Sequence, residues 1–237
     1  MDLYDGEIRK LISMLESHGA KKLPLLKEWE MTGKENLILK SEMAYELGGG
    51  SNQAVSAIAF TQDEKLVPED AVYLVGDDLR DIKNDISYAR ITVIRLDGEY
   101  IKNHDDNALY ASMRATDYVR YHAFPKGYMM RISAVREREP VRVSKEAVSH
   151  GINFAAVGLG LINAYRKRPE VEAVSIYFVT EQDIDYTFLK SEAHRCEQIT
   201  DSLNNIFNGI TMDCSTCSSR ELCDEIDGLR QLHMSIL

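Results

Sequence analysis

The segment that decides the fold runs from residue 154 to residue 180 and reads FAAVGLGLINAYRKRPEVEAVSIYFVT. Its first part, Phe154 to Tyr165, is strongly apolar and is followed by three basic residues and Pro169, a pattern typical of a helix end. Its second part, Val171 to Thr180, is rich in Val, Ile, Tyr and Phe, which favours a strand. The segment therefore predicts an apolar helix followed by a strand.

On the N-terminal side of this pair the sequence predicts one helix and then a strand-rich region. Apolar residues recur at helical spacing before Gly19, so residues 3–18 are predicted to form an amphipathic helix. Runs with strand character, each followed by turn residues, lie at 37–47, 54–61, 71–75 and 89–96. Residues 107–122 have helical composition, and 128–135 and 141–144 are predicted to be extended.

On the C-terminal side, residues 183–207 are predicted to form a long amphipathic helix. Ser218 and Glu221 form a candidate capping box for a last helix. Because strands come first and β and α elements do not alternate regularly, we expect an α+β fold, a mixed sheet packed with helices. We divide the chain into a helical segment (1–35), an α+β domain (36–210) and a Cys-containing loop with a C-terminal helix (211–237).

Composition and charge exclude several classes of function. The 237 residues are 44% hydrophobic and 28% charged, with a formal net charge of −10. Such an acidic chain does not favour an extended interface with nucleic acid, which needs a basic face. We expect a cytoplasmic protein with reduced thiols and no membrane contact, because the sequence shows no signal peptide and no apolar run of about 20 residues.

Three of the four cysteines lie close together, as Cys214, Cys217 and Cys223. A C-x2-C pair with a third thiol nearby can place three thiolates around zinc or an iron–sulfur cluster. Cys196 is the candidate fourth ligand, or His194 if the metal is zinc. The alternative is a polar loop with free thiols that form a disulfide on oxidation.

Four arginines form a basic stretch in this acidic chain: Arg131, Arg136, Arg138 and Arg142. Convergent guanidinium groups suit phosphates, including those of coenzyme A. The alternative is a solvated edge strand in which the interleaved Glu137 and Glu139 are the salt-bridge partners. The sequence predicts no catalytic residues, since both HExxH and G-x-S-x-G are absent.

Several segments, in this order, resemble the beta subunit of the acetyl-CoA decarbonylase/synthase complex, that is, acetyl-CoA synthase. They are Glu46-Leu47-Gly48-Gly49, Leu74-Val75-Gly76-Asp77-Asp78-Leu79, Arg142-Val143-Ser144-Lys145, Val174 to Glu181, and the pair Cys214 and Cys217. The resemblance covers the middle α+β domain of that enzyme and the start of its metal-bearing C-terminal domain. It implies a role in assembling acetyl-CoA from a methyl group, CO and coenzyme A at a nickel–iron–sulfur cluster.

The sequence departs from the family pattern at two places. The Cys-Gly-Cys tripeptide that holds the distal nickel is absent and Cys223 is the last cysteine, so we expect that this chain does not hold the nickel by itself. The family's tryptophan before its Arg-x-Ser-Lys segment is replaced by Glu139-Pro140-Val141, which weakens a coenzyme A site carried over from the family.

Three functions follow as hypotheses. The first is an acetyl-CoA synthase-like subunit or accessory protein of anaerobic one-carbon metabolism, with an iron–sulfur or metal site and a partner from a CO dehydrogenase, corrinoid or methyltransferase system. The second is a coenzyme A or nucleotide-binding module with a structural zinc site and no catalysis. The third is a CO-methylating, acetyl-CoA synthase-type transferase that depends on a second chain for its remaining ligands.

Overall fold

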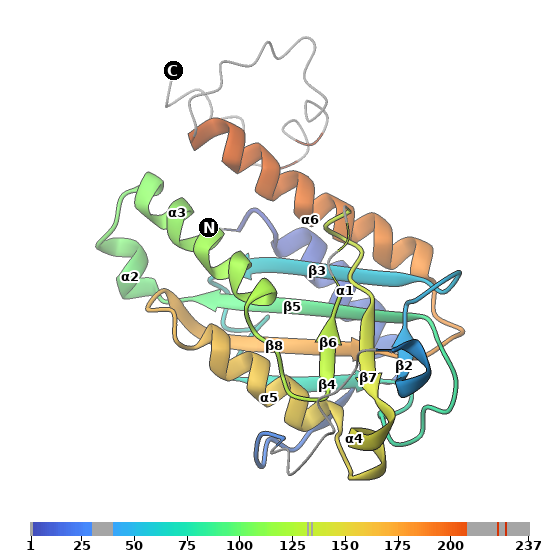
Figure 1. Cartoon of the computed structure of the whole chain (residues 1–237). Helices are drawn as coiled ribbons and strands as arrows, with labels where there is room; N and C mark the ends of the chain where they lie inside the picture. Colours follow the sequence, from blue (N-terminus) through green and yellow to red (C-terminus); the bar gives the residue numbers. More distant parts are fainter. Residues whose placement is uncertain are drawn as a thin grey trace.

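The computed structural model describes residues 2–29, 40–131, 133, 135–207, 222 and 226 (Figure 1). Its centre is a five-stranded mixed sheet in the order β1-β4-β8-β5-β3. The strands are β1 (Lys21–Leu23), β3 (Ala54–Thr61), β4 (Ala71–Val75), β5 (Tyr88–Leu96) and β8 (Val171–Val179). β8 runs parallel to β4 and antiparallel to β5, so the sheet is mixed as the α+β prediction requires.

The two central strands explain why this sheet forms. Every residue of β5 is buried, and so is every residue of β8 except Glu172. Central strands that are covered on both faces are rich in apolar and β-branched residues, and both of these strands are, although β5 also buries Arg90 and Arg95. The strand predicted at 171–180 is therefore confirmed and lies in the middle of the sheet.

A second, smaller sheet is antiparallel, in the order β2-β7-β6. Its strands are β2 (Ala44–Leu47), β6 (Tyr128–Met130) and β7 (Val141–Ser144). The hydroxyls of Tyr88 on β5 and Tyr128 on β6 lie 2.5 Å apart, which links the two sheets through a buried contact. Figure 1 shows this sheet in front of the main sheet, beside α5.

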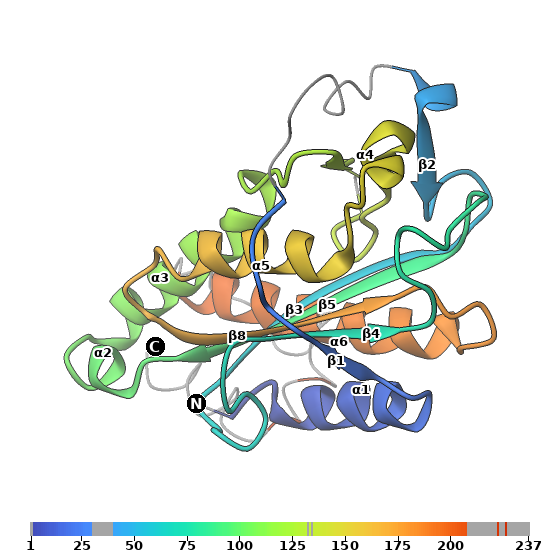
Figure 2. The same cartoon turned by 90° about the horizontal axis from the view of Figure 1, so that it is seen from below.

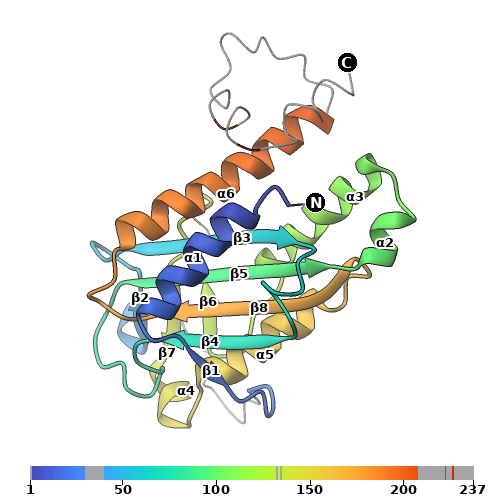
Figure 3. The ribbon, with the colours of Figure 1, turned by 180° about the vertical axis from the view of Figure 1, so that it is seen from behind.

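The helices cover both faces of the main sheet. α1 (Asp5–Ser17) and α6 (Tyr186–Phe207) lie on one face (Figure 3). α5 (Phe154–Tyr165), α3 (Asp106–Asp117) and the small sheet lie on the other (Figure 2). The remaining helical segments are short: η1 (Ser41–Met43), α2 (Gly98–Lys102), η2 (Tyr118–Tyr121) and α4 (Lys145–Ser149). None of the described helices has the length and apolarity needed to cross a bilayer.

α5 and β8 form the centre of the core. Phe154 at the start of α5 stacks on Phe178 of β8, with ring centroids 4.5 Å apart. Asn153 caps the helix, because its side chain accepts a hydrogen bond from the backbone N–H of Ala156. The predicted helix bounds, 154–165, are confirmed residue for residue.

Several of the predicted strands and helices differ in extent from the structure. Of the described residues of the strand predicted at 37–47, only β2 forms a strand, and Ser41–Met43 form η1. Of the described residues predicted to be extended at 128–135, only β6 forms a strand. After β6 the chain turns, and the N–H of Arg138 donates to the carbonyl of Val135 at 3.1 Å. The helix predicted at 183–207 begins at Tyr186, because the Asp185 carboxylate accepts hydrogen bonds from the N–H groups of Thr187 and Phe188.

Four short elements were not predicted: β1, η1, α2 and α4. Each has three to five residues, too few to show a hydrophobic period. The capping box of Ser218 and Glu221 lies outside the described residues, and of the last helix predicted after it only Leu222 and Ile226 are described, with the N–H of Ile226 donating to the carbonyl of Leu222 at 2.9 Å.

Candidate functional site

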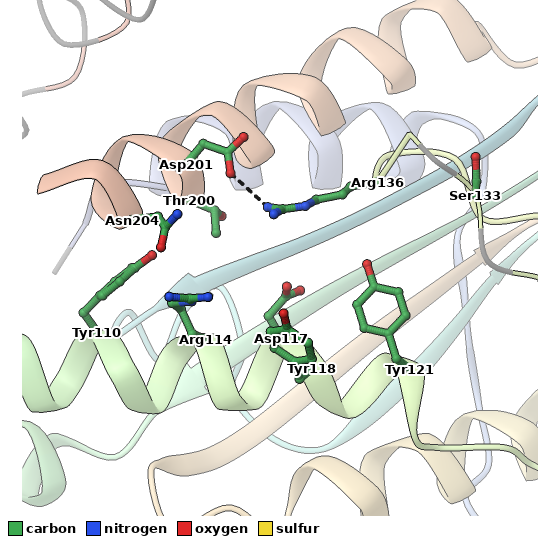
Figure 4. A pocket seen from close by; sticks show the side chains of 10 residues that line it. All are labelled: Tyr110, Arg114, Asp117, Tyr118, Tyr121, Ser133, Arg136, Thr200, Asp201 and Asn204. Atoms are coloured by element: carbon green, nitrogen blue, oxygen red, sulfur yellow. Dashed lines mark hydrogen bonds and ion pairs between the residues drawn. The ribbon is translucent and has the colours of Figure 1, made fainter. Parts of the chain in front are cut away.

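A pocket of about 310 Å³ lies between α3, η2, α6 and the loop that follows β6 (Figure 4). We call it the α3–α6 pocket. Its lining combines aromatic, cationic, anionic and neutral polar side chains: Tyr110, Arg114, Asp117, Tyr118, Tyr121, Ser133, Arg136, Thr200, Asp201 and Asn204.

Helix geometry explains why these residues meet. Asp105 caps α3 by accepting a hydrogen bond from the N–H of Ala108 at 2.8 Å. Tyr110, Arg114 and Asp117 then follow at intervals of four and three residues, which places them on one face of the helix. Thr200, Asp201 and Asn204 share a face of α6 in the same way, and the two faces oppose each other across the pocket (Figure 4).

Ion pairs connect the loop after β6 and η2 to α6. The guanidinium of Arg136 lies 2.9 Å from the Asp201 carboxylate and 3.6 Å from that of Glu197. Arg120, whose side chain is fully buried, lies 3.3 Å from both Asp117 and Glu197. Two cations and three carboxylates therefore hold the C-terminal half of α6 against η2 and the loop.

Burial changes the titration of two of these carboxylates. It raises the pKa of Asp117 and of Glu197, and in both cases the neighbouring Arg120 acts in the opposite direction. Burial also raises the pKa of the Tyr110 hydroxyl to about 12, against the opposing influence of Arg114. At neutral pH Tyr110 is therefore protonated and able to donate a hydrogen bond.

The four arginines singled out by sequence do not converge on one point. Arg131 and Arg142 share Glu46, at 2.8 and 2.5 Å, and Arg138 donates to the carbonyl of Gly48 at 3.4 Å. Three of the four arginines line a small hollow next to the α3–α6 pocket, namely Arg131, Arg136 and Arg138. Tyr121, Phe124 and Glu139 line the same hollow.

The alternative interpretation of that stretch, an edge strand whose arginines form salt bridges with Glu137 and Glu139, is wrong. Residues 136 and 137 form a turn. Glu137 pairs with His194 at 3.3 Å, and Glu139 pairs with the buried Arg90 at 2.6 Å. Arg142 meets Glu46 because the two are opposite each other in the register of β7 and β2, and Arg136 in the turn reaches the carboxylates of α6.

The cysteines fall into two groups. Cys196 lies in the middle of α6 with its thiol fully buried in the core, and burial raises the pKa of that thiol. The other three predicted ligands, Cys214, Cys217 and Cys223, lie outside the described residues. Within the described part of the chain, no three or more His, Cys, Asp and Glu side chains are grouped to hold a metal.

Sequence reasoning missed most of the α3–α6 pocket. The helix at 107–122 was predicted, but its polar face was not, although Tyr110, Arg114 and Asp117 recur at helical spacing and could have been found that way. No local signal joins that face to Asp201 or Asn204 of α6.

The comparisons with known proteins agree with the resemblance seen in the sequence. Residues 30–184 match the family described as CO dehydrogenase/acetyl-CoA synthase complex beta subunit. The match begins before β2 and ends before α6, so it includes both sheets except β1. No curated protein matches the chain. Because the family match covers well over half of the sequence, this chain belongs to the CO dehydrogenase/acetyl-CoA synthase complex beta subunit family.

Proposed function

We propose that this protein is an acetyl-CoA synthase-like subunit or accessory protein of anaerobic one-carbon metabolism that carries a thiolate-bound iron–sulfur site. The family match supports the metabolic role, and the donor set of Cys214, Cys217 and Cys223 supports the cluster. The partner we propose belongs to a CO dehydrogenase, corrinoid or methyltransferase system, in the cytoplasm.

The position of α6 bears on how this site is attached to the domain. α6 ends at Phe207, seven residues before Cys214, and its C-terminal half is held by Arg120 and Arg136. α6, which follows the family-matched region and precedes the thiol-bearing segment in the sequence, is therefore held to its neighbours by packing and by ion pairs.

Cys196 remains our candidate for the fourth ligand, and the structure defines what that would require. Its thiol is buried, and it lies eleven residues before the end of α6, roughly 16 Å along the helix axis at about 1.5 Å per residue. A thiolate at this position needs compensation by the metal itself, because burial disfavours the charged form.

Anaerobic purification with iron and acid-labile sulfide analysis tests the cluster. We expect the wild-type protein to show the broad visible absorption of an iron–sulfur cluster, and the Cys214→Ser, Cys217→Ser, Cys223→Ser triple variant to lose iron and sulfide together. Equal iron and sulfide in the triple variant would disprove the site. The single variant Cys196→Ala tests whether Cys196 is the fourth ligand. Loss of iron identifies Cys196 as that ligand, and full retention of iron assigns the fourth position to another residue.

A second candidate function is a coenzyme A or nucleotide-binding module with a structural zinc at the same thiols and His194 or Cys196 as the fourth ligand. The hollow lined by Arg131, Arg136 and Arg138 supports it through Arg138, which lies in the same hollow as Phe124 and Tyr121, whereas Arg131 and Arg136 are paired with Glu46 and Asp201. Isothermal titration with coenzyme A tests it. Binding of coenzyme A to the wild-type protein, with an affinity at least tenfold lower for Arg138→Gln, supports this function. Absence of binding heat in the wild type rejects it.

A further inference from the structure

The charged residues that line the α3–α6 pocket are two arginines and two aspartates, and they differ in their partners. Asp201 is paired with Arg136, and Asp117 is paired with Arg120 beneath the pocket. Arg114, a half-buried residue on α3, forms no ion pair with any residue in the described part of the chain. Arg114 is therefore the lining cation that has no carboxylate partner among the described residues.

Hydrogen-bonding groups lie beside that guanidinium. The side chains of Tyr110 on α3 and Asn204 on α6 point toward each other next to Arg114 (Figure 4). Arg114 is close enough to Tyr110 to influence its pKa, and the phenol remains a donor at neutral pH. A carboxylate bound to Arg114 would meet neutral polar groups as well as the cation, which is the usual arrangement of a specific anion site.

The other end of the pocket offers aromatic surface. Tyr118 and Tyr121 meet edge to face, with centroids 5.9 Å apart, and Tyr118 is 52% exposed. The Arg120 guanidinium lies 4.9 Å from the centre of the Tyr121 ring, which fixes that ring in place. A flat ring on the ligand would cover tyrosine surface that is otherwise in contact with water.

The charged residues and the volume of the α3–α6 pocket limit the class of ligand that it can bind. A polyphosphate would add several negative charges to a pocket that already holds Asp117 and Asp201, and like charges at close range disfavour binding. A single negative charge is enough to pair with Arg114. A volume of about 310 Å³ lies at the lower end of the range for small-molecule sites. We propose that the α3–α6 pocket binds a small, ring-bearing carboxylate, with its carboxylate on Arg114 and its ring against Tyr118 and Tyr121.

This site goes beyond the proposed thiolate cluster and beyond the coenzyme A hypothesis, and it depends on neither. It uses Arg114, Tyr110 and Asn204, which line neither the adjacent hollow nor the segment of the three cysteines. Its presence would add a small-molecule ligand to a protein whose family is that of a complex subunit.

Ligand-observed fluorine NMR tests the proposal on the full chain, with 4-fluorobenzoate as the probe. We expect binding with Kd at or below about 1 mM for the wild type, and a loss of at least tenfold in affinity for Arg114→Gln. Arg80→Gln is the matched control, because Arg80 is an exposed arginine whose side chain is 76% accessible and lies in the loop after β4. This control variant is expected to bind as the wild type does.

Two further arms test the class of ligand. The neutral 4-fluorobenzyl alcohol keeps the ring and lacks the charge, so its affinity should be at least tenfold weaker. Tyr118→Ala, a substitution at an exposed position that leaves Arg114 in place, should weaken 4-fluorobenzoate binding several-fold. Unchanged thermal unfolding of each variant shows that the fold is retained.

Four outcomes would overturn the proposal: no binding of 4-fluorobenzoate up to about 10 mM, equal affinity of wild type and Arg114→Gln, equal binding of the neutral alcohol, or displacement of the probe by adenosine monophosphate at lower concentration than by benzoate. The last result would assign the pocket to a phosphate ligand. Since neither the cysteines nor Arg138 enter this experiment, its failure leaves the proposed function unaffected.

Discussion

At the scale of single residues, the least expected feature is a buried ion pair at the centre of the molecule. Arg90 is 2% exposed and Glu139 is 8% exposed, and their side chains lie 2.6 Å apart. The hydroxyl of Ser56 donates to the same carboxylate at 3.1 Å, and Arg90 also contacts the sulfur of Met130. Removing one partner would leave the other charge in the core without compensation.

We predict that Glu139→Gln lowers the free energy of unfolding by about 3 kcal/mol or more, because Arg90 stays charged and buried. Urea denaturation measures the change. Glu137→Gln, two residues away and paired with the exposed His194, is the control and should change stability by less than about 0.5 kcal/mol. Equal changes in the free energy of unfolding for the two substitutions would show that the buried pair contributes no more to stability than the exposed one.

At the scale of elements, α5 illustrates how a helix face is adapted to a sheet. Gly158 lies against β4 and β8, and a Cβ added there would collide with Val72 and come within 3.2 Å of Phe178. Gly160, two residues further on, faces outward, and an added Cβ would find no atom nearer than 3.8 Å. The first glycine is required by close packing and the second is not.

These two positions make a matched pair of substitutions. Gly158→Ala is expected to destabilise the protein by about 1–3 kcal/mol, because the helix must move away from the sheet. Gly160→Ala is expected to stabilise it by up to about 1 kcal/mol, since alanine has the higher helix propensity. Thermal or urea unfolding of the two variants measures both, and a shift of the same sign in each would contradict the packing argument.

At the scale of the whole molecule, the carboxylates between η2 and α6 should make stability depend on pH. The pKa values of Asp117 and Glu197 are raised by burial, so the folded protein binds these protons more tightly than the unfolded chain. The contribution of these two groups to the free energy of unfolding therefore decreases as pH rises from about 4, their ordinary range, through their raised pKa values.

The double variant Asp117→Asn, Glu197→Gln removes both titrations. We predict that the difference in unfolding free energy between the wild type and this variant changes across that pH window and is constant below it. Urea denaturation at several pH values measures the difference. A difference that does not vary with pH would mean that neither carboxyl has a raised pKa in the folded protein.

The α5–β8 pair, the α+β class and the family could all be predicted from sequence, and local physics is the reason. The apolar run at Phe154–Tyr165, its cap at Asn153 and the β-branched residues of β8 act over a few neighbours, so their effect is readable in the chain. The three clustered thiols are equally local. They specify a possible ligand set by spacing alone.

The arrangement of charges was decided only by the tertiary structure. Arg136 meets Asp201 across 65 residues of sequence, and Arg90 meets Glu139 across 49, through turns and strand orders that no short pattern encodes. For the same reason, the alternative in which Glu137 and Glu139 pair with the neighbouring arginines was wrong, and the polar face of α3 was not recognised as one wall of a pocket. Spacing along a chain determines helices, strands and ligand sets, whereas ion pairs and pockets depend on which distant segments pack together.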